Sequence, residues 1–297
     1  MDIARNAEIS DYEVSPTFRR GSNTTGPDGT SATMIDEADR DLIHSCLRLL
    51  WNKSWASGEF VSDWKEENSI VIYKPGKDDY HECNAYRTIS ITSCLGKRFE
   101  HITSQRLISI LTEGYFDKDK FAYITRESST WAILTVVETM KKSLLYGHSV
   151  GAVFFADTFG SVDRACLLHK IHMDFGITGH LYDHISSFLE WKNCTYKDRQ
   201  VDWRLAGVWL WHISWHAFRT FVVHFHDIPK CIRPKYADDL VVVSTAHNVL
   251  EIESDLQEAT NQLVQWAWYN GTWYNEGMVI NVAKIKVMVM LFGECQH

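Results

Sequence analysis

Two apolar runs that adjoin aspartates constrain the fold of this chain most strongly. Residues 150–156 are continuously apolar and are followed by Asp157, and residues 240–244 are mostly apolar and are preceded by Asp238 and Asp239. Runs of this length and composition are typical of strands buried on both faces of a sheet. If the two strands lie side by side with these ends at one edge of the sheet, the three aspartates form one cluster.

A cluster of carboxylates at the edge of a buried sheet has a limited set of uses. An ionised carboxylate is costly there unless it is paired or bound to metal. Mg²⁺ prefers such oxygen ligands and is commonly held by one or two carboxylates together with substrate phosphates. Two Mg²⁺ ions about 3.5–4 Å apart can activate an attacking 3′-oxygen and stabilise the leaving oxygen. The cluster favours nucleotidyl transfer, and the alternatives are aspartates on a solvated turn or a capping aspartate at a strand end.

The other hydrophobic periodicities predict a mixture of helices and strands, and hence an α+β chain. Further helices are expected from near Ile35 onward and at 95–111, 131–145 and 248–270, and further strands at 69–74 and 279–290. The first helix is expected to bury Leu42, Ile43, Cys46, Leu47 and Leu50. The helix at 131–145 is expected to bury Ile133, Val136, Val137, Met140 and Leu144. In the last helix, Asn248 and Glu251 have the spacing of a capping box.

Charge and composition say more about the compartment of the protein than about its activity. The net charge of −8 counts against a nucleic-acid binder, although residues 85–146 hold nine basic and six acidic residues. Seven cysteines without a C-x-x-C pair indicate neither a disulfide framework nor a zinc site. This favours an intracellular protein, cytoplasmic or nuclear. The most apolar stretch, 205–225, contains Arg219 and three histidines, so no membrane span is expected.

Several segments resemble the motifs of one polymerase family. The run Lys235-Tyr-Ala-Asp-Asp-Leu240 resembles the polymerase hairpin of reverse transcriptases, and Val153–Asp163 resembles their other catalytic segment. Residues 73–78 and 86–91 resemble fingers segments of the non-LTR group, and 281–288 resembles its lysine-bearing strand. The segments occur in the family's order from about residue 35 onward. The chain is similar to the reverse transcriptase (RNA-directed DNA polymerase) domain of non-LTR, jockey- or LINE-like retrotransposons.

This resemblance implies a fold and a division of the chain. The expected fold is an α+β right-hand polymerase core with fingers and palm and with most of the thumb missing. The expected division is a flexible polar leader at 1–33, fingers at 34–149, and a palm with the metal site at 150–297. The flexible leader is also predicted from its own composition, which is rich in Ser, Thr and Gly. No endonuclease segment is expected ahead of the fingers.

The resemblance also implies roles for individual residues. Two Mg²⁺ ions, with Mn²⁺ as an alternative, would be held by Asp157, Asp238 and Asp239, with Lys284 as a further catalytic residue near the reacting phosphates. The residues expected to bind the incoming nucleotide are Lys74, Arg87, Val162, Tyr236 and Ala237. The implied partners are an RNA template, a DNA primer and dNTPs. Each basic residue also has a simpler interpretation: Lys74 as a turn residue, Arg87 in a surface ion pair and Lys284 as a solvated strand residue.

Departures from the family's motifs support a second hypothesis. The family usually has Pro-Gln-Gly where this chain has Trp209-Leu-Trp211, and it has an aromatic residue at the position of Val162. Such changes favour a degenerate, non-catalytic reverse-transcriptase-like fragment that at most binds nucleic acid. A third hypothesis, a metal-dependent phosphohydrolase that uses the same acids, predicts activity without primer or template. It leaves the ordered fingers motifs unexplained.

Overall fold

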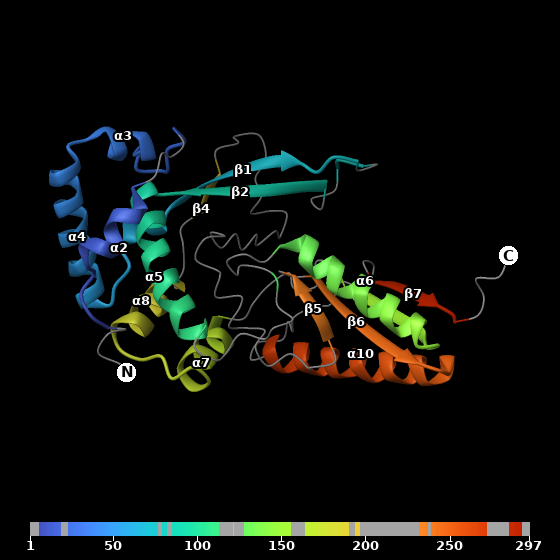
Figure 1. Ribbon diagram of the computed structural model, residues 1–297. Coiled ribbons are helices and arrows are strands. Elements are labelled where there is room, and N and C mark those ends of the chain that lie inside the picture. Colours follow the sequence, from blue (N-terminus) through green and yellow to red (C-terminus); the bar gives the residue numbers. More distant parts are fainter. Residues whose placement is uncertain are drawn as a thin grey trace. The chain divides into compact units, whose positions relative to one another are not determined.

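The computed structural model describes residues 6–18, 23–76, 79–81, 85–112, 121, 128–155, 164–189, 194–196, 232–236, 239–271 and 285–292. The chain divides into two compact units, residues 1–110 with 171–220 and residues 111–170 with 221–297. Each unit combines helices with a small sheet, so the α+β class is confirmed (Figure 1). The names fingers and palm, with a boundary at 149/150, stay predictions. No helix in the described part of the chain is both long and apolar enough to cross a membrane.

The first unit contains a three-stranded sheet and most of the helices. Its strands are β1 (Glu67–Tyr73), β2 (Tyr86–Thr92) and β4 (Cys194–Tyr196), in the order β2-β1-β4. Strand β1 pairs antiparallel with β2 and parallel with β4. Its helical elements are α2 (Asp11–Val14), η1 (Ser15–Thr17), α3 (Ala32–Glu37), α4 (Arg40–Ser57), η2 (Ser62–Lys65), α5 (Cys94–Thr112) and α8 (His180–Leu189). Helix α7 (Arg164–Met173) crosses the boundary between the units.

Helix α4 differs from its prediction in where it begins and in which face it buries. The chain leaves helical geometry at Ala38, and α4 begins after Asp39, whose side chain accepts a hydrogen bond from the backbone N–H of Leu42. The buried residues are Leu47, Trp51, Ser54 and Trp55, whereas Leu42, Cys46 and Leu50 are exposed. Two tryptophans bury far more apolar area than leucines do. The helix therefore faces inward along its tryptophan side.

The described part of the N-terminal stretch is packed, although its composition predicts a flexible leader. Ile9 and Val14 are fully buried, and Asn52 on α4 hydrogen-bonds both the N–H and the carbonyl of Ile9. The Arg106 guanidinium on α5 donates to both carboxylate oxygens of Glu13. The buried side chains of Ile9 and Val14 and the Arg106–Glu13 ion pair hold this segment in place. The polar residues that flank it in the sequence do not indicate burial. Residues 6–18 are thus packed against α4 and α5, and the flexible leader at 1–33 stays a prediction.

The second unit is a four-stranded antiparallel sheet with a helix on each face. Its strands are β3 (Ser149–Phe155), β5 (Ile232–Tyr236), β6 (Asp239–Ala246) and β7 (Lys286–Met290), in the order β5-β6-β3-β7. Its helices are α6 (Ser129–Leu145) and α10 (Val249–Gly271). The predicted elements at 131–145, 150–156, 240–244 and 248–270 are confirmed within a few residues. Of the strand predicted at 279–290, residues 279–284 lie outside the described residues.

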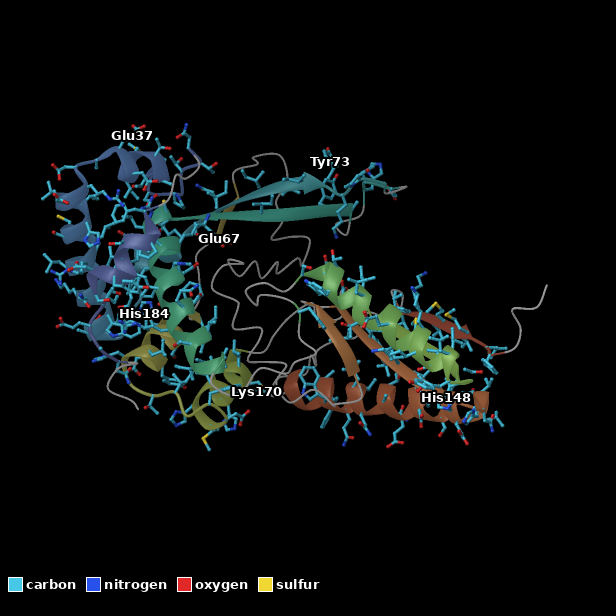
Figure 2. The ribbon with its side chains drawn as sticks, in the orientation of Figure 1. Glu37, Glu67, Tyr73, His148, Lys170 and His184 are labelled. Carbon is cyan, nitrogen blue, oxygen red and sulfur yellow. The ribbon has the colours of Figure 1, made fainter. Side chains whose placement is uncertain are left out.

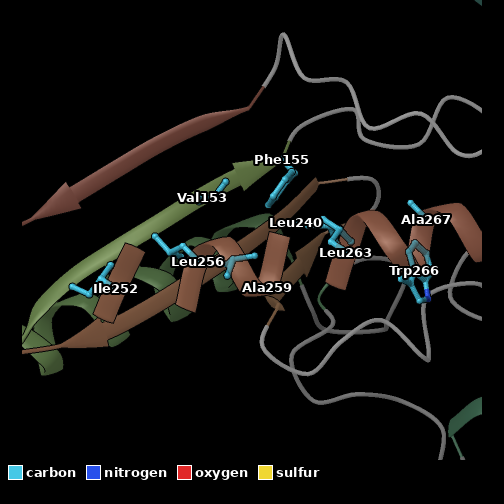
Figure 3. Close-up of a cluster of buried hydrophobic side chains, with 10 residues drawn as sticks. Val153, Phe155, Leu240, Ile252, Leu256, Ala259, Leu263, Trp266 and Ala267 are labelled. Atoms are coloured by element: carbon cyan, nitrogen blue, oxygen red, sulfur yellow. The ribbon is translucent and has the colours of Figure 1, made fainter. Parts of the chain in front are cut away.

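Helix α10 covers one face of the sheet through the apolar stripe that its sequence predicts. Ile252, Leu256, Ala259 and Leu263 are buried against β3 and β6 (Figure 3). Close approach is needed here, because a Cβ placed on Gly151 would lie 2.3 Å from Cγ2 of Ile252. The glycine in the middle of β3 allows the helix to lie directly on the strand.

Helix α6 covers the opposite face. Val136 and Met140 are buried with Val150 and Ala152 of β3. The predicted face is wrong at one end, since Ile133 is 63% exposed and the neighbouring Ala132 is buried in its place.

Candidate active site

The site predicted from sequence depends on how β3 and β6 lie relative to each other. The two strands pair antiparallel along their whole length, from Ser149 opposite Ala246 to Phe155 opposite Leu240. The end of β3 therefore lies beside the start of β6. These are the strand ends that precede Asp157 and follow Asp238 in the sequence. The side-by-side arrangement of the two buried strands is confirmed, while Asp157 and Asp238 themselves lie outside the described residues.

The start of β6 is joined to β5 by a two-residue connection. Tyr236 is the last residue of β5 and pairs with Asp239, the first residue of β6. Ala237 and Asp238 are the two residues between them and lie outside the described residues. Two-residue connections are the commonest β-hairpin loops. Asp239 is exposed, so its carboxylate is accessible to a ligand from solvent.

The core of the second unit holds these strand ends in place. Phe155 and Leu240, which pair across the ladder, are each 1% exposed and belong to the cluster under α10. Ser244 on β6 donates a hydrogen bond of 2.7 Å to the carboxylate of Asp255 on α10. Both features fix β6 against its helix, which would limit the movement of any ligand carried by the adjoining hairpin.

The two predicted substrate-binding residues of the first unit lie on its β1–β2 hairpin. Lys74 directly follows β1; its N–H donates to the carbonyl of Ala85 at 2.8 Å, and its carbonyl accepts from the hydroxyl of Tyr80 at 3.1 Å. Arg87 lies on β2 opposite Ile72 of β1. Lys74 and Arg87 therefore both lie near the loop end of the β1–β2 hairpin, and their binding of the nucleotide stays a prediction.

The remaining predicted residues, Val162 and Lys284, lie outside the described residues. Lys284 precedes Ile285, which packs partly buried against the cluster under α10, and β7 begins one residue later. No group of three or more His, Cys, Asp or Glu side chains suited to a metal ion occurs within the described ranges. Two of the three predicted ligands, Asp157 and Asp238, fall outside those ranges.

The first unit contains a buried histidine that sequence reasoning did not single out. His184 on α8 is 1% exposed (Figure 2). The centroid of its imidazole lies 4.4 Å from that of the Phe99 ring and 5.3 Å from that of the Phe60 ring. Neither ring nitrogen has a hydrogen-bond partner among the described residues. Burial, with the nearby charges of Lys65 and Arg106, lowers the pKa of His184 to about 3. The signal in the sequence is the apolar spacing of Leu181, Ile185 and Phe188 around it.

A second finding concerns a buried lysine of the second unit. Lys170 on α7 is 5% exposed, and its ammonium lies 5.3 Å from the centroid of the Trp266 ring on α10. A cation over the face of a tryptophan is attracted by the ring's quadrupole. Because this contact joins α7 to α10, Lys170 has a structural use in the second unit, and no motif in the sequence pointed to it.

Comparison with known proteins supports a distant relationship to reverse transcriptases. No protein-family model matches the chain. Over 243 residues the chain is 25% identical to a probable RNA-directed DNA polymerase from transposon BS of Drosophila melanogaster. The match covers 74% of this chain and 26% of that protein. The chain thus spans about a quarter of the length of its relative, and the similarity reaches only a reverse-transcriptase-like relationship.

Proposed function

We propose that the chain carries the fingers and palm of an RNA-directed DNA polymerase of the non-LTR retrotransposon type. The observation that carries the proposal is the pairing of Phe155 with Leu240, which places side by side the two strand ends that adjoin Asp157 and Asp238 in the sequence. The 25% identity to a transposon polymerase supports the same activity. In this proposal, residues 34–149 form the fingers and residues 150–297 the palm.

The metal ligands in this proposal are Asp157, Asp238 and Asp239. A set of carboxylates fits Mg²⁺, which prefers hard oxygen ligands. Asp239 is exposed at the first position of a strand whose next residue is fully buried, so one ligand is accessible while its backbone is anchored. When bound, two Mg²⁺ ions would assist attack of the primer 3′-oxygen on the α-phosphorus and departure of pyrophosphate. Mn²⁺ could replace Mg²⁺ in the same ligand set.

The basic residues would position the nucleotide. Lys74 and Arg87 at the end of the β1–β2 hairpin, together with Lys284, would neutralise the triphosphate. Tyr236, Ala237 and Val162 would contact the nucleotide and primer end. Valine is smaller than the aromatic residue usual at position 162, so discrimination against ribonucleotides is expected to be weak. The partners are an RNA template, a DNA primer and dNTPs, which a nuclear or cytoplasmic protein would meet.

A degenerate fold that has lost catalysis is the second candidate. It is favoured by the net charge of −8 and by Trp209-Leu-Trp211, which lies outside the described residues. The two candidates differ in one property that is simple to measure. A polymerase site binds a nucleotide in a Mg²⁺-dependent way, whereas a fold that only binds nucleic acid does not.

Titration calorimetry separates these candidates. The affinity of the chain for dTTP is measured once in the presence of Mg²⁺ and once in the presence of EDTA. The proposal predicts binding with Mg²⁺ that is at least tenfold weaker in EDTA and in an Asp238→Ala, Asp239→Ala variant. The matched control is Glu253→Ala, Glu258→Ala, which removes two exposed carboxylates from α10 in the same unit and should bind like the unchanged chain. Equal dTTP affinity with Mg²⁺ and with EDTA would exclude the proposed metal site.

A further inference from the structure

The connection between β1 and β2 is long for a hairpin. It runs over residues 74–85, whereas common hairpin loops have about two to five residues. Residues 77–78 and 82–84 of it lie outside the described residues. Because an ordered loop of this length has lost much conformational entropy, contacts of its own must hold it in one conformation.

Three tyrosines hold the described part of this loop. Figure 2 shows Tyr73 at the loop end of β1, where it forms the last pair of the ladder with Tyr86, and the two ring centroids lie 5.0 Å apart. The Tyr80 ring, from the loop itself, lies 5.3 Å from the Tyr73 ring and 6.4 Å from the Tyr86 ring, edge-on to both. Aromatic pairs prefer this edge-to-face arrangement. We define the tyrosine cluster as Tyr73, Tyr80 and Tyr86.

Two hydroxyl groups of the tyrosine cluster link Lys74 to β2. The Tyr86 hydroxyl donates to the carbonyl of Tyr80 at 2.7 Å, and the Tyr80 hydroxyl donates to the carbonyl of Lys74 at 3.1 Å. The N–H of Lys74 donates to the carbonyl of Ala85 at 2.8 Å, and Ala85 is fully buried. Both backbone polar groups of Lys74 are thereby fixed, one by Ala85 and the other by Tyr80.

The chain turns directly after Lys74. Pro75 and Gly76 form this turn, and Gly76 has a φ of 76°, in the left-handed region that glycine enters without strain. The turn allows the chain to fold back so that Tyr80 reaches the end of the hairpin. Lys74 therefore lies between the regular ladder and the folded-back loop.

The tyrosine cluster contributes little to the core of the first unit. Tyr73 is 64% exposed and Tyr80 is 37% exposed. Hydrophobic stabilisation is proportional to the apolar area removed from water, so rings exposed to this extent contribute only part of what a buried ring does. The specific result of the two hydroxyl bonds is the conformation of the loop at Lys74.

Lys74 is the residue of this loop that the proposed polymerase uses, because it is expected to neutralise the nucleotide triphosphate. The ammonium of a lysine is carried on a flexible four-carbon stem, and ordering it on a ligand costs conformational entropy. A main chain that is already fixed lowers this cost. The resemblance to reverse transcriptases gives Lys74 this task and gives Tyr80 none.

We propose that Tyr80 is a positioning residue for Lys74. Its hydroxyl, held through the Tyr86 hydroxyl to β2, orders the loop before the nucleotide binds, so that the Lys74 ammonium is available to the triphosphate at a lower entropic cost. This inference rests on the proposed function, and it adds to that function a residue that acts through Lys74.

Substitution by phenylalanine tests the hydroxyl bonds, because it removes the oxygen and keeps the ring. In calorimetry of dTTP with Mg²⁺, Tyr80→Phe and Tyr86→Phe should each weaken binding about two- to tenfold, the effect of one neutral hydrogen bond. The matched control is Tyr12→Phe, which removes the hydroxyl of an 86% exposed tyrosine in the same unit and should bind like the unchanged chain. Undiminished binding by Tyr80→Phe overturns the proposal.

A double-mutant cycle shows whether Tyr80 acts through Lys74. Lys74→Ala should weaken dTTP binding about tenfold or more, because it removes a charged contact to phosphate. In the Lys74→Ala background, Tyr80→Phe should have no further effect. An equal effect of Tyr80→Phe with and without Lys74 would show that the hydroxyl acts on the fold in general, and this outcome contradicts a positioning role.

Amide hydrogen exchange without nucleotide separates this inference from the polymerase proposal. Tyr80→Phe should speed exchange in peptides that cover residues 74–85 by about two- to tenfold, while Tyr12→Phe leaves it unchanged. An unchanged rate in Tyr80→Phe overturns the inference whatever the chain does with dTTP. Mg²⁺-dependent dTTP binding that Lys74→Ala and Tyr80→Phe both leave unchanged overturns the inference and leaves the metal site standing, whereas no Mg²⁺-dependent binding by the unchanged chain overturns both.

Discussion

Replacing Gly151 with alanine tests the packing that holds the candidate site. Gly151 lies in the middle of β3, the strand whose end adjoins Asp157. A Cβ at this position would lie 2.3 Å from Cγ2 of Ile252 and 2.8 Å from Cδ1 of Leu256. The Leu256 methyl can rotate away, but Cγ2 of a β-branched side chain moves only with the helix. We therefore expect Gly151→Ala to push α10 off the sheet.

Two opposing effects decide the magnitude. An extra methyl in a packed core costs about 1–3 kcal/mol. Alanine is favoured over glycine in a strand by about 0.5–1 kcal/mol, because glycine loses more conformational freedom on folding. The clash is the larger effect, so Gly151→Ala should lower the free energy of unfolding by about 1–2 kcal/mol. For a unit of this size the loss corresponds to about 2–8 °C in the melting temperature.

Urea unfolding followed by circular dichroism measures the loss, and a second substitution identifies its cause. Ile252→Ala alone opens a cavity and should cost about 2–5 kcal/mol. In that background the Cγ2 atom is absent, so Gly151→Ala should be neutral or stabilising. Stability of the single Gly151→Ala variant equal to or above that of the unchanged chain would refute this account of β3 and α10. Equal cost in both backgrounds would show that the clash with Ile252 is not the cause.

Three further substitutions test the rest of the fold. In the folded chain His184 stays neutral, whereas in the unfolded chain it binds a proton below about pH 6.5. The free energy of unfolding is therefore full above about pH 6.5 and falls as the pH drops toward 3. Urea unfolding should show a loss of about 2 kcal/mol from pH 7 to pH 5, and His184→Leu should abolish this loss. Arg106→Ala leaves Glu13 without its bidentate partner, so limited proteolysis should cut within residues 6–18 at least tenfold faster, and an unchanged rate would contradict the packed N-terminal segment. Ser244→Ala should lower the free energy of unfolding by about 1 kcal/mol, and less than 0.3 kcal/mol would show that its bond to Asp255 contributes little.

The sequence predicts elements best where one periodicity dominates. The stripe of Ile252, Leu256, Ala259 and Leu263 predicts both the extent and the buried face of α10, because every member points to one side. In α4 two stripes compete, one of aliphatic residues and one that contains Trp51 and Trp55. The number of apolar positions predicts that the aliphatic stripe is buried. The larger apolar area of the tryptophans favours burial of the stripe that contains Trp51 and Trp55, and this is the stripe that the structure buries.

Partners far apart in the chain explain what periodicity could not predict. Ile9 is buried because Asn52, 43 residues away, satisfies its backbone groups. Glu13 is held because Arg106 donates to its carboxylate; burial alone would raise the pKa of Glu13, and the bonds from Arg106 and Ser10 reverse this and lower it. Neither contact has a signature within the polar N-terminal sequence, which on composition reads as flexible.

Periodicity also predicts only part of the candidate site. The apolar runs predict that β3 and β6 are buried neighbours, and the pairing of Phe155 with Leu240 confirms that they are neighbours. Strand β3 is buried at nearly every residue, whereas β6 is fully buried only at alternate residues. The roles of Asp157, Asp238 and Lys284 come from a resemblance in motifs, not from periodicity. They stay predictions until metal binding and activity are measured.

Primer extension tests the central claim most directly. The unchanged chain is incubated with a poly(rA) template, an oligo(dT) primer, dTTP and Mg²⁺, beside the Asp238→Ala, Asp239→Ala variant and the Glu253→Ala, Glu258→Ala control. The account predicts extension by the unchanged chain and the control, with none in the aspartate variant or without Mg²⁺. No extension by a sample shown to be folded, or equal extension by the aspartate variant, would contradict it.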